Sequence, residues 1–263
     1  MPELPDVEKF RLYLQSTALH QQIRTTSIVD AAVLKGIGES HFSESLRGRT
    51  FEKAHRHGKF CFLRQDDQRF VFLHFGMTGF VKYYTKEMTA PEHIRLSFEF
   101  TNDYTLAYNC QRKFGQVGIT NDIEGFIDSE ELGPDALDGE FGEDEFIQRL
   151  QGRRSMLKTA LMNQQVIAGI GNIYSDEILF QQRLHPKISL GQLKKTTLQR
   201  IYTTMREVLT KAIHAEADPA KMAPSMLTHH RYGDGKCPSC KADIEKIEVA
   251  GRRSCYCPSC QDN

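Results

Sequence analysis

The chain has 263 residues, of which 40% are hydrophobic and 26% are charged, a usual composition for a globular protein. This length predicts two domains with a small appendage. No apolar run approaches the length of a membrane span and no signal-peptide segment follows Met1, so we expect a cytoplasmic protein without a membrane partner. The seven cysteines agree, because Cys61 and Cys110 stand apart and the others crowd the C-terminal end, unlike a secreted disulfide framework.

The charge is unevenly distributed along the chain. The formal net charge is zero, with 34 basic and 34 acidic residues. Residues 116–148 hold eleven Asp and Glu and no Lys or Arg, which leaves 34 basic and 23 acidic residues elsewhere. We interpret this stretch as an acidic connector between two more basic bodies, of which the C-terminal one is the more basic. Two such bodies could straddle a polyanion.

The N-terminal half predicts one helix followed by short strands. Apolar residues recur near helical spacing over 7–19, so we expect a helix that begins just after Pro5 and Asp6, with Asp6 suited to its N-terminal end. Strand-like runs, divided by polar or glycine-bearing turns, occupy 25–34, 59–65, 69–76, 79–84, 93–100 and 104–109. Strands at this spacing are typical of a β-sandwich or a barrel.

The pattern changes after the acidic stretch. Helical periodicity occupies about 143–151, 154–165, 172–183 and 192–214. From Gly233 onward the chain is polar and rich in cysteine, and this segment is too short to fold without help.

Four cysteines in the last segment have the spacing of a metal site. Cys237-Pro-Ser-Cys240 and Cys257-Pro-Ser-Cys260 are two C-x2-C knuckles separated by sixteen residues, as in a four-thiolate zinc ribbon. Two disulfides or an idle pair are the alternatives. Four thiolates leave no open coordination position, so the one Zn²⁺ expected here would be structural and would hold a hairpin.

Two further stretches are suited to binding phosphate. Gly169 and Gly171 permit tight turns, and we expect Asn172 to be the N-cap of the following helix, whose free amides would face outward. The alternative is a simple helix cap. Arg252 and Arg253 are expected near the turn of the zinc hairpin, where an arginine can reach a phosphate; a solvated surface pair is the alternative reading.

Five motifs occur in order across nearly the whole chain: PELPDVE at 2–8, HFGMTGF at 74–80, QRKFG at 111–115, AGIGNIYSDEILF at 168–180 and GRRSCYCPSCQ at 251–261. Together they resemble the formamidopyrimidine-DNA glycosylase and endonuclease VIII family, and the PELP start is closer to the formamidopyrimidine branch. The resemblance implies a bifunctional DNA glycosylase and abasic-site lyase of base excision repair that acts as a monomer on damaged double-stranded DNA.

The resemblance assigns catalytic roles to four residues. Methionine before proline is normally removed, which would leave Pro2 with a secondary amine that attacks the anomeric carbon of the damaged nucleotide and forms a Schiff base. Glu3 would protonate the opening sugar and shuttle protons afterwards. Lys59, in HGKF, would contact the phosphate beside the lesion and assist the β- and δ-elimination. Arg252 matches the family's hairpin arginine, which binds a phosphate.

The same match assigns DNA-binding residues. A flipped-out base leaves a hole in the duplex. Arg112 would pair with the orphaned base, Phe114 would wedge into the stack, and Met77 would fill the void. Other residues would bind phosphates: Arg154 and Asn172, and more weakly His74.

The implied fold is α+β, with an N-terminal β-sandwich flanked by helices and a C-terminal helical domain that carries a helix-two-turns-helix motif and a zinc ribbon. We expect the catalytic sandwich domain at 1–120, the acidic connector at 121–145, the DNA-binding helical domain at 146–232 and the ribbon at 233–263. The enzyme would be associated with the nucleoid.

The sequence departs from the family at three places. Asn109-Cys110 stands where Asp-Pro is usual, and Pro91 replaces the first of two histidines. The segment after the long helix is shorter than usual and lacks the glycine-rich pattern that covers an everted 8-oxoguanine. Formamidopyrimidines or other oxidised purines are the expected substrates, and hydantoins, oxidised pyrimidines and bare abasic sites are the alternative substrates. Two other functions stay open: a DNA-damage binder with weak catalysis, and an N-terminal-proline tautomerase.

Overall fold

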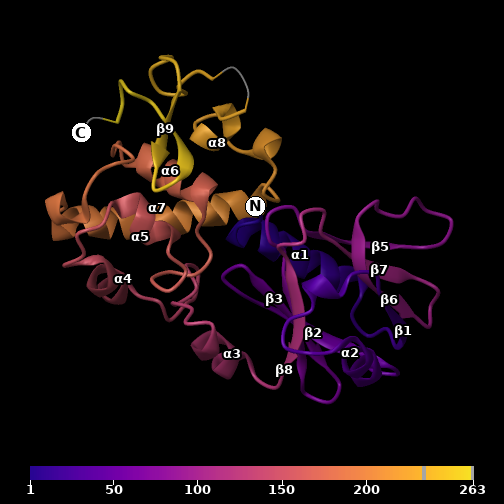
Figure 1. Cartoon of the computed structure of the whole chain (residues 1–263). Coiled ribbons are helices and arrows are strands. Elements are labelled where there is room, and N and C mark those ends of the chain that lie inside the picture. Colours follow the sequence, from indigo (N-terminus) through magenta and orange to yellow (C-terminus); the bar gives the residue numbers. More distant parts are fainter. Residues whose placement is uncertain (233–234, 262–263) are drawn as a thin grey trace. The chain divides into compact units, whose positions relative to one another are not determined.

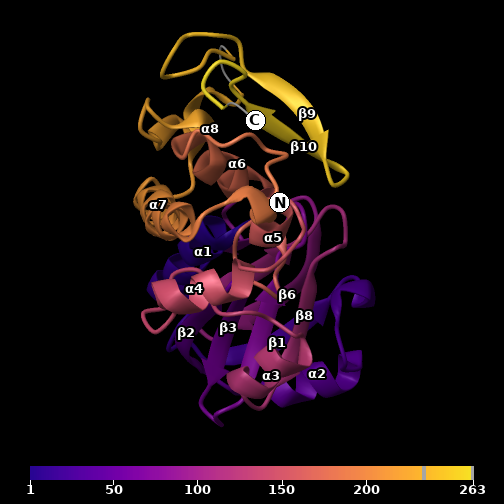
Figure 2. The same cartoon turned by 90° about the vertical axis from the view of Figure 1, so that its left-hand side faces the viewer.

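The computed structural model describes residues 1–232 and 235–261. The chain divides into two compact units (Figures 1 and 2). The first unit contains Met1–Pro2 and Asp6–Glu130, and the second contains Glu3–Pro5 and the chain from Glu131 onward. Three residues at the N-terminus therefore fold with the C-terminal half of the sequence.

The first unit contains helices around two antiparallel sheets. One sheet has the strand order β1-β6-β7-β5 and the other has the order β2-β3-β4-β8. The elements, in chain order, are α1 (Leu4–Thr17, whose first two residues belong to the second unit), β1 (Ile23–Ile28), the 3₁₀ helix η1 (Ala31–Val33), α2 (Glu39–Leu46), β2 (Phe51–His57), β3 (Phe60–Gln65), β4 (Phe70–His74), β5 (Phe80–Tyr84), β6 (Ile94–Phe100), β7 (Thr105–Asn109), β8 (Gln116–Thr120) and α3 (Ile123–Ser129).

The two sheets pack face to face around one apolar core. Alternate residues of β6, Leu96, Phe98 and Phe100, are fully buried, as the alternation of this strand predicts. Phe51 of β2 meets Phe98 edge to face, with ring centroids 5.5 Å apart, so the two sheets share this core. The predicted β-sandwich is confirmed.

The outer face of the second sheet is covered by one aromatic side chain of α3. Phe126 lies 4.6 Å from the ring of Phe72 and between 5.1 and 5.3 Å from the rings of Phe60 and Phe62. Asp122 caps the helix by accepting hydrogen bonds from the Glu124 and Gly125 amides. Part of the acidic stretch is therefore an ordered helix anchored on the sandwich.

Several element predictions need correction. The first helix begins at Leu4, ahead of the position expected from Pro5 and Asp6, because proline is tolerated in the first turn, where amides have no intrahelical acceptor. The strand expected over 25–34 ends at Ile28, and Asp30 then caps the 3₁₀ helix η1. β2, β8 and α2 were not predicted; β2 alternates weakly and ends in the polar run His55-Arg56-His57.

The second unit is helical, with a two-stranded hairpin at its C-terminal end (Figure 2). Its elements are α4 (Glu143–Leu150), α5 (Leu157–Met162), α6 (Asn172–Gln181), the 3₁₀ helix η2 (Leu190–Gln192), α7 (Lys195–His214), the 3₁₀ helix η3 (Pro219–Lys221), α8 (Leu227–His230), β9 (Glu245–Val249) and β10 (Arg252–Tyr256). Helices were expected near α4, α5, α6 and α7, and α5 is shorter than predicted.

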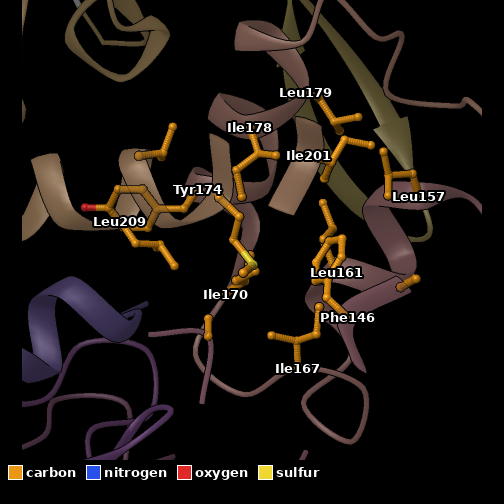
Figure 3. Packing of buried hydrophobic residues seen from close by; sticks show 14 of the residues in the cluster. Phe146, Leu157, Leu161, Ile167, Ile170, Tyr174, Ile178, Leu179, Ile201 and Leu209 are labelled. Atoms are coloured by element: carbon orange, nitrogen blue, oxygen red, sulfur yellow. The ribbon is translucent and has the colours of Figure 1, made fainter. Parts of the chain in front are cut away.

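Helix α6 runs through the centre of the second unit. Its residues from Tyr174 to Phe180 are all buried, and Ile178 and Leu179 pack with Leu157, Leu161 and Ile201 from neighbouring helices (Figure 3). These residues lie on every side of the helix, so protein surrounds α6 over this stretch. Polar side chains of α6 must therefore find partners inside the protein. No helix within residues 1–232 and 235–261 is both long and apolar enough to cross a membrane.

Candidate active site

The carboxylate of Glu3 binds the N-terminus of α6. The Gly171 amide donates to Oε2 at 2.7 Å, the Ile173 amide donates to Oε1 at 2.8 Å, and the Tyr174 amide donates to Oε2 at 3.3 Å. These amides are the ones that a helix leaves without intrahelical acceptors, and the helix dipole favours a negative charge there. Glu3 is 1% exposed. Its carboxylate is therefore held in one place and one orientation.

Two glycines make room for the N-terminal segment. Gly169 has φ +113°, a conformation that side chains rarely allow, and its carbonyl accepts a hydrogen bond of 3.0 Å from the Leu4 amide. A Cβ on Gly171 would lie 2.5 Å from Oε1 of Glu3. The turn glycines thus let the chain at Glu3 and Leu4 approach the helix directly.

The expectation for Asn172 is wrong in one respect. The N-cap of α6 is Gly171, and the amides that were expected to face outward donate to Glu3. The side chain of Asn172 instead donates from Nδ2 to the Arg253 carbonyl at 2.8 Å, and its buried Oδ1 accepts no hydrogen bond within the described residues. Sequence spacing could not reveal this, since the capping carboxylate lies far away along the chain.

A buried ionic cluster of Lys158, Asp176, Arg231 and Ser254 is centred on Asp176, in the middle of α6. The Asp176 carboxylate accepts hydrogen bonds from all three other side chains and, at 2.9 Å, from the Cys255 amide. Burial lowers the pKa of Lys158, while the Asp176 carboxylate acts to raise it. Charges this deeply buried are stable only as a mutually satisfied set.

The cluster was not predicted, although Asp176 and Ser254 lie within the quoted motifs. Its four members come from α5, α6, the residue that follows α8, and β10. The polar run Ser175-Asp176-Glu177 within α6 was the one signal in the sequence that could have pointed to it. Together with Asn172 it fastens β10 to α6. The hairpin arginines are thus presented from a rigid base.

Arg252 and Arg253 follow the tight turn of the hairpin. Ala250 and Gly251 both have positive φ, 49° and 73°, as a two-residue β-hairpin turn requires. Both arginines are exposed. Arg252 also lines a cavity of about 260 Å³ together with Lys158, Thr159 and Asn163.

The four knuckle cysteines come together in space. The Sγ atoms of Cys237, Cys240, Cys257 and Cys260 all lie within 4.8 Å of one another. Cys255 is buried nearby and is not part of the cluster. Four thiolates in this arrangement fit one tetrahedral Zn²⁺ and leave no coordination position for a catalytic water molecule.

Lys59 and His74 share one end of the second sheet of the sandwich. Lys59 lies in the two-residue turn between β2 and β3 and is 7% exposed, and its neighbour Phe60 pairs with His74 across the ladder. Burial, together with the positive charges of Lys59 and Lys35, lowers the pKa of His74 to about 4. The imidazole is therefore neutral at physiological pH.

Met77, Arg112 and Phe114 come from two adjacent loops of the first unit. The guanidinium of Arg112 lies 5.2 Å from the centroid of the Phe114 ring, and the Arg112 amide donates to Oγ1 of Thr78 at 3.4 Å. Met77 is 39% exposed and Phe114 is 57% exposed, which is unusual for such side chains. The two loops thus present one protruding apolar and cationic surface.

The two remaining predicted site residues, Pro2 and Arg154, differ in their exposure and in their neighbours. Pro2 is partly exposed and directly precedes the anchored Glu3. Arg154 is exposed in the loop before α5, and no hydrogen bond among the described residues joins it to Asn172 or Arg252. Within the second unit, hydrogen bonds therefore join Glu3 to the N-terminus of α6 and Asn172 to the hairpin.

Family models match most of the chain. The "Formamidopyrimidine-DNA glycosylase N-terminal domain" matches residues 1–117, the "Formamidopyrimidine-DNA glycosylase H2TH domain" matches 132–223, and the "Zinc finger found in FPG and IleRS" matches 235–263. The four cysteines therefore form a zinc finger that binds one Zn²⁺, as predicted.

Known relatives match over the full length. The formamidopyrimidine-DNA glycosylase of Protochlamydia amoebophila is 31% identical over 99% of both chains, and that of Symbiobacterium thermophilum is 32% identical over 99% of this chain and 89% of the relative. Among solved structures, complexes of the Lactococcus lactis protein with DNA containing an abasic site and with DNA containing FAPY-dG have TM-scores of 0.89 at 28% and 29% identity, each covering 99% of this chain and 100% of the other.

Removal of zinc is expected to unfold the hairpin while the sandwich stays folded, because metal binding supplies the folding energy of such small segments. Hydrogen exchange of the β9 and β10 amides, with and without a chelator, measures this. Cys257→Ser should lose the ion and Cys255→Ser should retain it, measured as zinc per chain. Full zinc content in Cys257→Ser would contradict the four-thiolate site.

The low pKa of His74 makes the protein less stable in acid. Since the unfolded chain binds this proton near pH 6.5 and the folded chain only near pH 4, the free energy of unfolding should fall as the pH drops from 7 towards 4. The slope attributable to His74 is at most about 1.4 kcal/mol per pH unit. Urea unfolding at pH 7 and pH 5 should show a smaller loss for His74→Gln than for wild type and for the exposed control His41→Gln. Equal losses in all three would refute the shift.

Proposed function

Since the chain belongs to the formamidopyrimidine-DNA glycosylase family, and is thus a DNA glycosylase of DNA repair, we propose that it excises oxidised bases and then cleaves the resulting abasic site through a Schiff base on Pro2. The observation that carries this proposal is the anchoring of Glu3. A carboxylate fixed at a helix N-terminus directly after Pro2 supplies a positioned proton donor and acceptor next to an amine.

The proposed reaction begins with attack by the amine. After removal of Met1, the Pro2 nitrogen lone pair forms a bond to C1′ of the damaged nucleotide, and the electron pair of the N-glycosidic bond leaves with the base. The Pro2 nitrogen gives up the proton it carried and the departing base takes one up. Glu3 then protonates the ring oxygen as the sugar opens. The product is an iminium that joins Pro2 to C1′, with no change in oxidation state.

Elimination would follow from the same intermediate. The iminium accepts electrons when a proton leaves C2′, so the 3′-phosphate departs by β-elimination; a second proton loss expels the 5′-phosphate by δ-elimination. Lys59 would assist these proton transfers at the adjacent phosphate. Its place in a tight turn with 7% exposure restricts its side chain, which suits one defined contact.

Phosphate binding would fall to Arg252, Asn172, Arg154 and His74. The hairpin that carries Arg252 is fastened to α6 through the Asp176 cluster, so its backbone needs little ordering on binding. His74 would donate one hydrogen bond as a neutral ring. The DNA would be double-stranded and the enzyme would act as a monomer associated with the nucleoid.

The flipped-out nucleotide would leave a hole for Met77, Arg112 and Phe114. Their exposed positions on two adjoining loops are consistent with insertion into a duplex, and the guanidinium beside the Phe114 ring could face the orphaned base.

The segment after α7 bears on the choice of lesion. Met222, Met226 and Leu227 are buried at 2%, 3% and 1% exposure, so this segment packs on its own unit rather than forming a long covering loop within residues 215–232. We propose ring-opened formamidopyrimidines and other oxidised purines that need no such cover as substrates. Oxidised pyrimidines and hydantoins, as for endonuclease VIII, are the second candidates.

Borohydride trapping on duplexes with an abasic site or a formamidopyrimidine tests the chemistry. Wild type should form a covalent adduct, and Glu3→Gln should lower its rate of formation by at least about 100-fold, the usual contribution of a general acid. Blocking the Pro2 amine should abolish it.

A matched control is Glu177→Gln, because Glu177 is another buried carboxylate that binds helix N-terminal amides, those of Leu227 and Thr228 at 3.1 and 2.7 Å. It should trap like wild type. Absence of any adduct in processed wild type would favour a damage binder, and adducts that survive in Glu3→Gln would refute the role of Glu3.

Arg112→Ala should reduce lesion processing and opposite-base preference more than it reduces binding to intact duplex, because only the flipped state exposes an orphaned base. Single-turnover excision and equilibrium binding measure the two effects, and the exposed Arg47→Ala serves as control. Equal losses on damaged and intact DNA would contradict the orphan-base role.

A further inference from the structure

The loop that carries Arg112 begins at Cys110, directly after β7. The Lys113 amide donates to the Cys110 carbonyl at 3.3 Å, which closes a turn, and Lys113 has a left-handed φ of 56°. Because the Arg112 side chain is exposed, the orientation of this turn depends on contacts made by its backbone.

Arg95 of β6 binds this turn by its backbone. Its Nε donates to the Cys110 carbonyl at 2.9 Å and its Nη2 donates to the Gln111 carbonyl at 3.2 Å. These carbonyls belong to the two consecutive peptide planes that precede Arg112. Because each peptide unit is planar, fixing both carbonyls fixes the direction in which the chain enters Arg112.

The second of these planes is held from both sides. Its carbonyl accepts from Arg95, and its N–H, that of Arg112, donates to Oγ1 of Thr78 at 3.4 Å. The Cys110 amide, one residue earlier, donates to the His93 carbonyl at 3.0 Å. The base of the loop is thus restrained on the strand side, while the Arg112 and Phe114 side chains are exposed.

A β-bulge directs Arg95 towards the loop. The pairing of β6 with β7 shifts register between Ile94 and Leu96, so Arg95 is the extra residue. Bulges re-aim side chains, and they are retained where that direction matters. The Arg95 carbonyl also accepts from the Val29 and Asp30 amides at 2.9 and 3.2 Å, which holds the bulge against the end of β1.

Asp30 lies behind the arginine as its counter-ion. Its Oδ2 lies 3.9 Å from Arg95 Nη1 and 2.6 Å from Lys113 Nζ. The Asp30 carboxylate therefore links Arg95, which binds the start of the loop, to Lys113, which has the left-handed φ. Both Asp30 and Arg95 are less than one-fifth exposed, so water competes with this contact only in part.

We propose that Arg95, backed by Asp30, is a positioning residue for Arg112 that sets how strictly the enzyme discriminates the base opposite the lesion. The inference rests on the proposed function, because it requires Arg112 to read the orphaned base. Arg95 touches no DNA in this account. It acts by holding the two peptide planes from which Arg112 extends.

Arg95→Lys is the test, because lysine keeps the charge beside Asp30 but cannot donate a planar fork to two carbonyls. A matched control is Arg24→Lys. Arg24 also stands at a register shift, between Ile23 and Thr25, and its Nη2 donates to the Thr101 carbonyl at 3.2 Å and to Asp103 at 2.9 Å in a different turn.

Two activities are measured for each protein. The first is the ratio of single-turnover excision rates with the most and the least favoured base opposite the lesion. The second is borohydride trapping on an abasic site in single-stranded DNA, which has no opposite base. Arg95→Lys should lower the first ratio about tenfold and change trapping less than twofold, and Arg24→Lys should change neither.

The outcomes separate the inference from the proposed function. A wild type that does not trap refutes the proposed function. If the wild type forms the adduct and discriminates between opposite bases, an Arg95→Lys variant that discriminates equally well overturns the inference. A wild type that does not discriminate between opposite bases also overturns it. Equal losses in both activities would show that Arg95 is merely structural. If Arg95→Lys does not fold, Asp30→Asn, which keeps the cap on the Ala32 amide, should lower the ratio in the same direction, and an unchanged ratio would overturn the inference.

Discussion

The second unit depends on one interaction, the carboxylate of Glu3 at the N-terminus of α6. Three backbone amides converge on this side chain, and a helix N-terminus buried without such an acceptor would be costly. The interaction draws the start of the chain into the C-terminal unit, where Leu4 joins the apolar core. A side chain with a catalytic role in the proposal is thus also a structural cap, which ties the geometry of the chemistry to the folding of the helix.

Further constraints on α6 follow from the same arrangement. Gly171 leaves the space that Glu3 occupies, and Asp176, farther along the helix, fastens β10 through Ser254 and the Cys255 amide. One buried helix therefore positions the N-terminal segment at one end and the arginine hairpin along its side. The zinc ion holds the other end of that hairpin. This explains why a structural metal can matter to a reaction in which it takes no part.

Sequence patterns predicted the features that depend on local periodicity and spacing. The burial of Leu96 and Phe98 on β6 and the clustering of the four cysteines follow from period-two alternation and from C-x2-C spacing. Features that depend on distant partners were missed or misjudged. Asn172 has the right residue type for a cap, yet Glu3 supplies the acceptor. The contacts of Arg95 with the Cys110 and Gln111 carbonyls depend on a register shift that no sequence pattern encodes. The Asp176 cluster was hidden for the same reason, since its members come from four separate elements.

The most direct test of the central claim is an amide chemical-shift comparison of wild type and Glu3→Gln by nuclear magnetic resonance. A hydrogen bond to a carboxylate moves an amide proton downfield, so the amides of Gly171, Ile173 and Tyr174 should all move upfield when Glu3 becomes neutral. Amides at the start of α7 should not change. Unchanged shifts at the three α6 amides would contradict the anchoring of Glu3, and with it the account of how this chain positions its reacting groups.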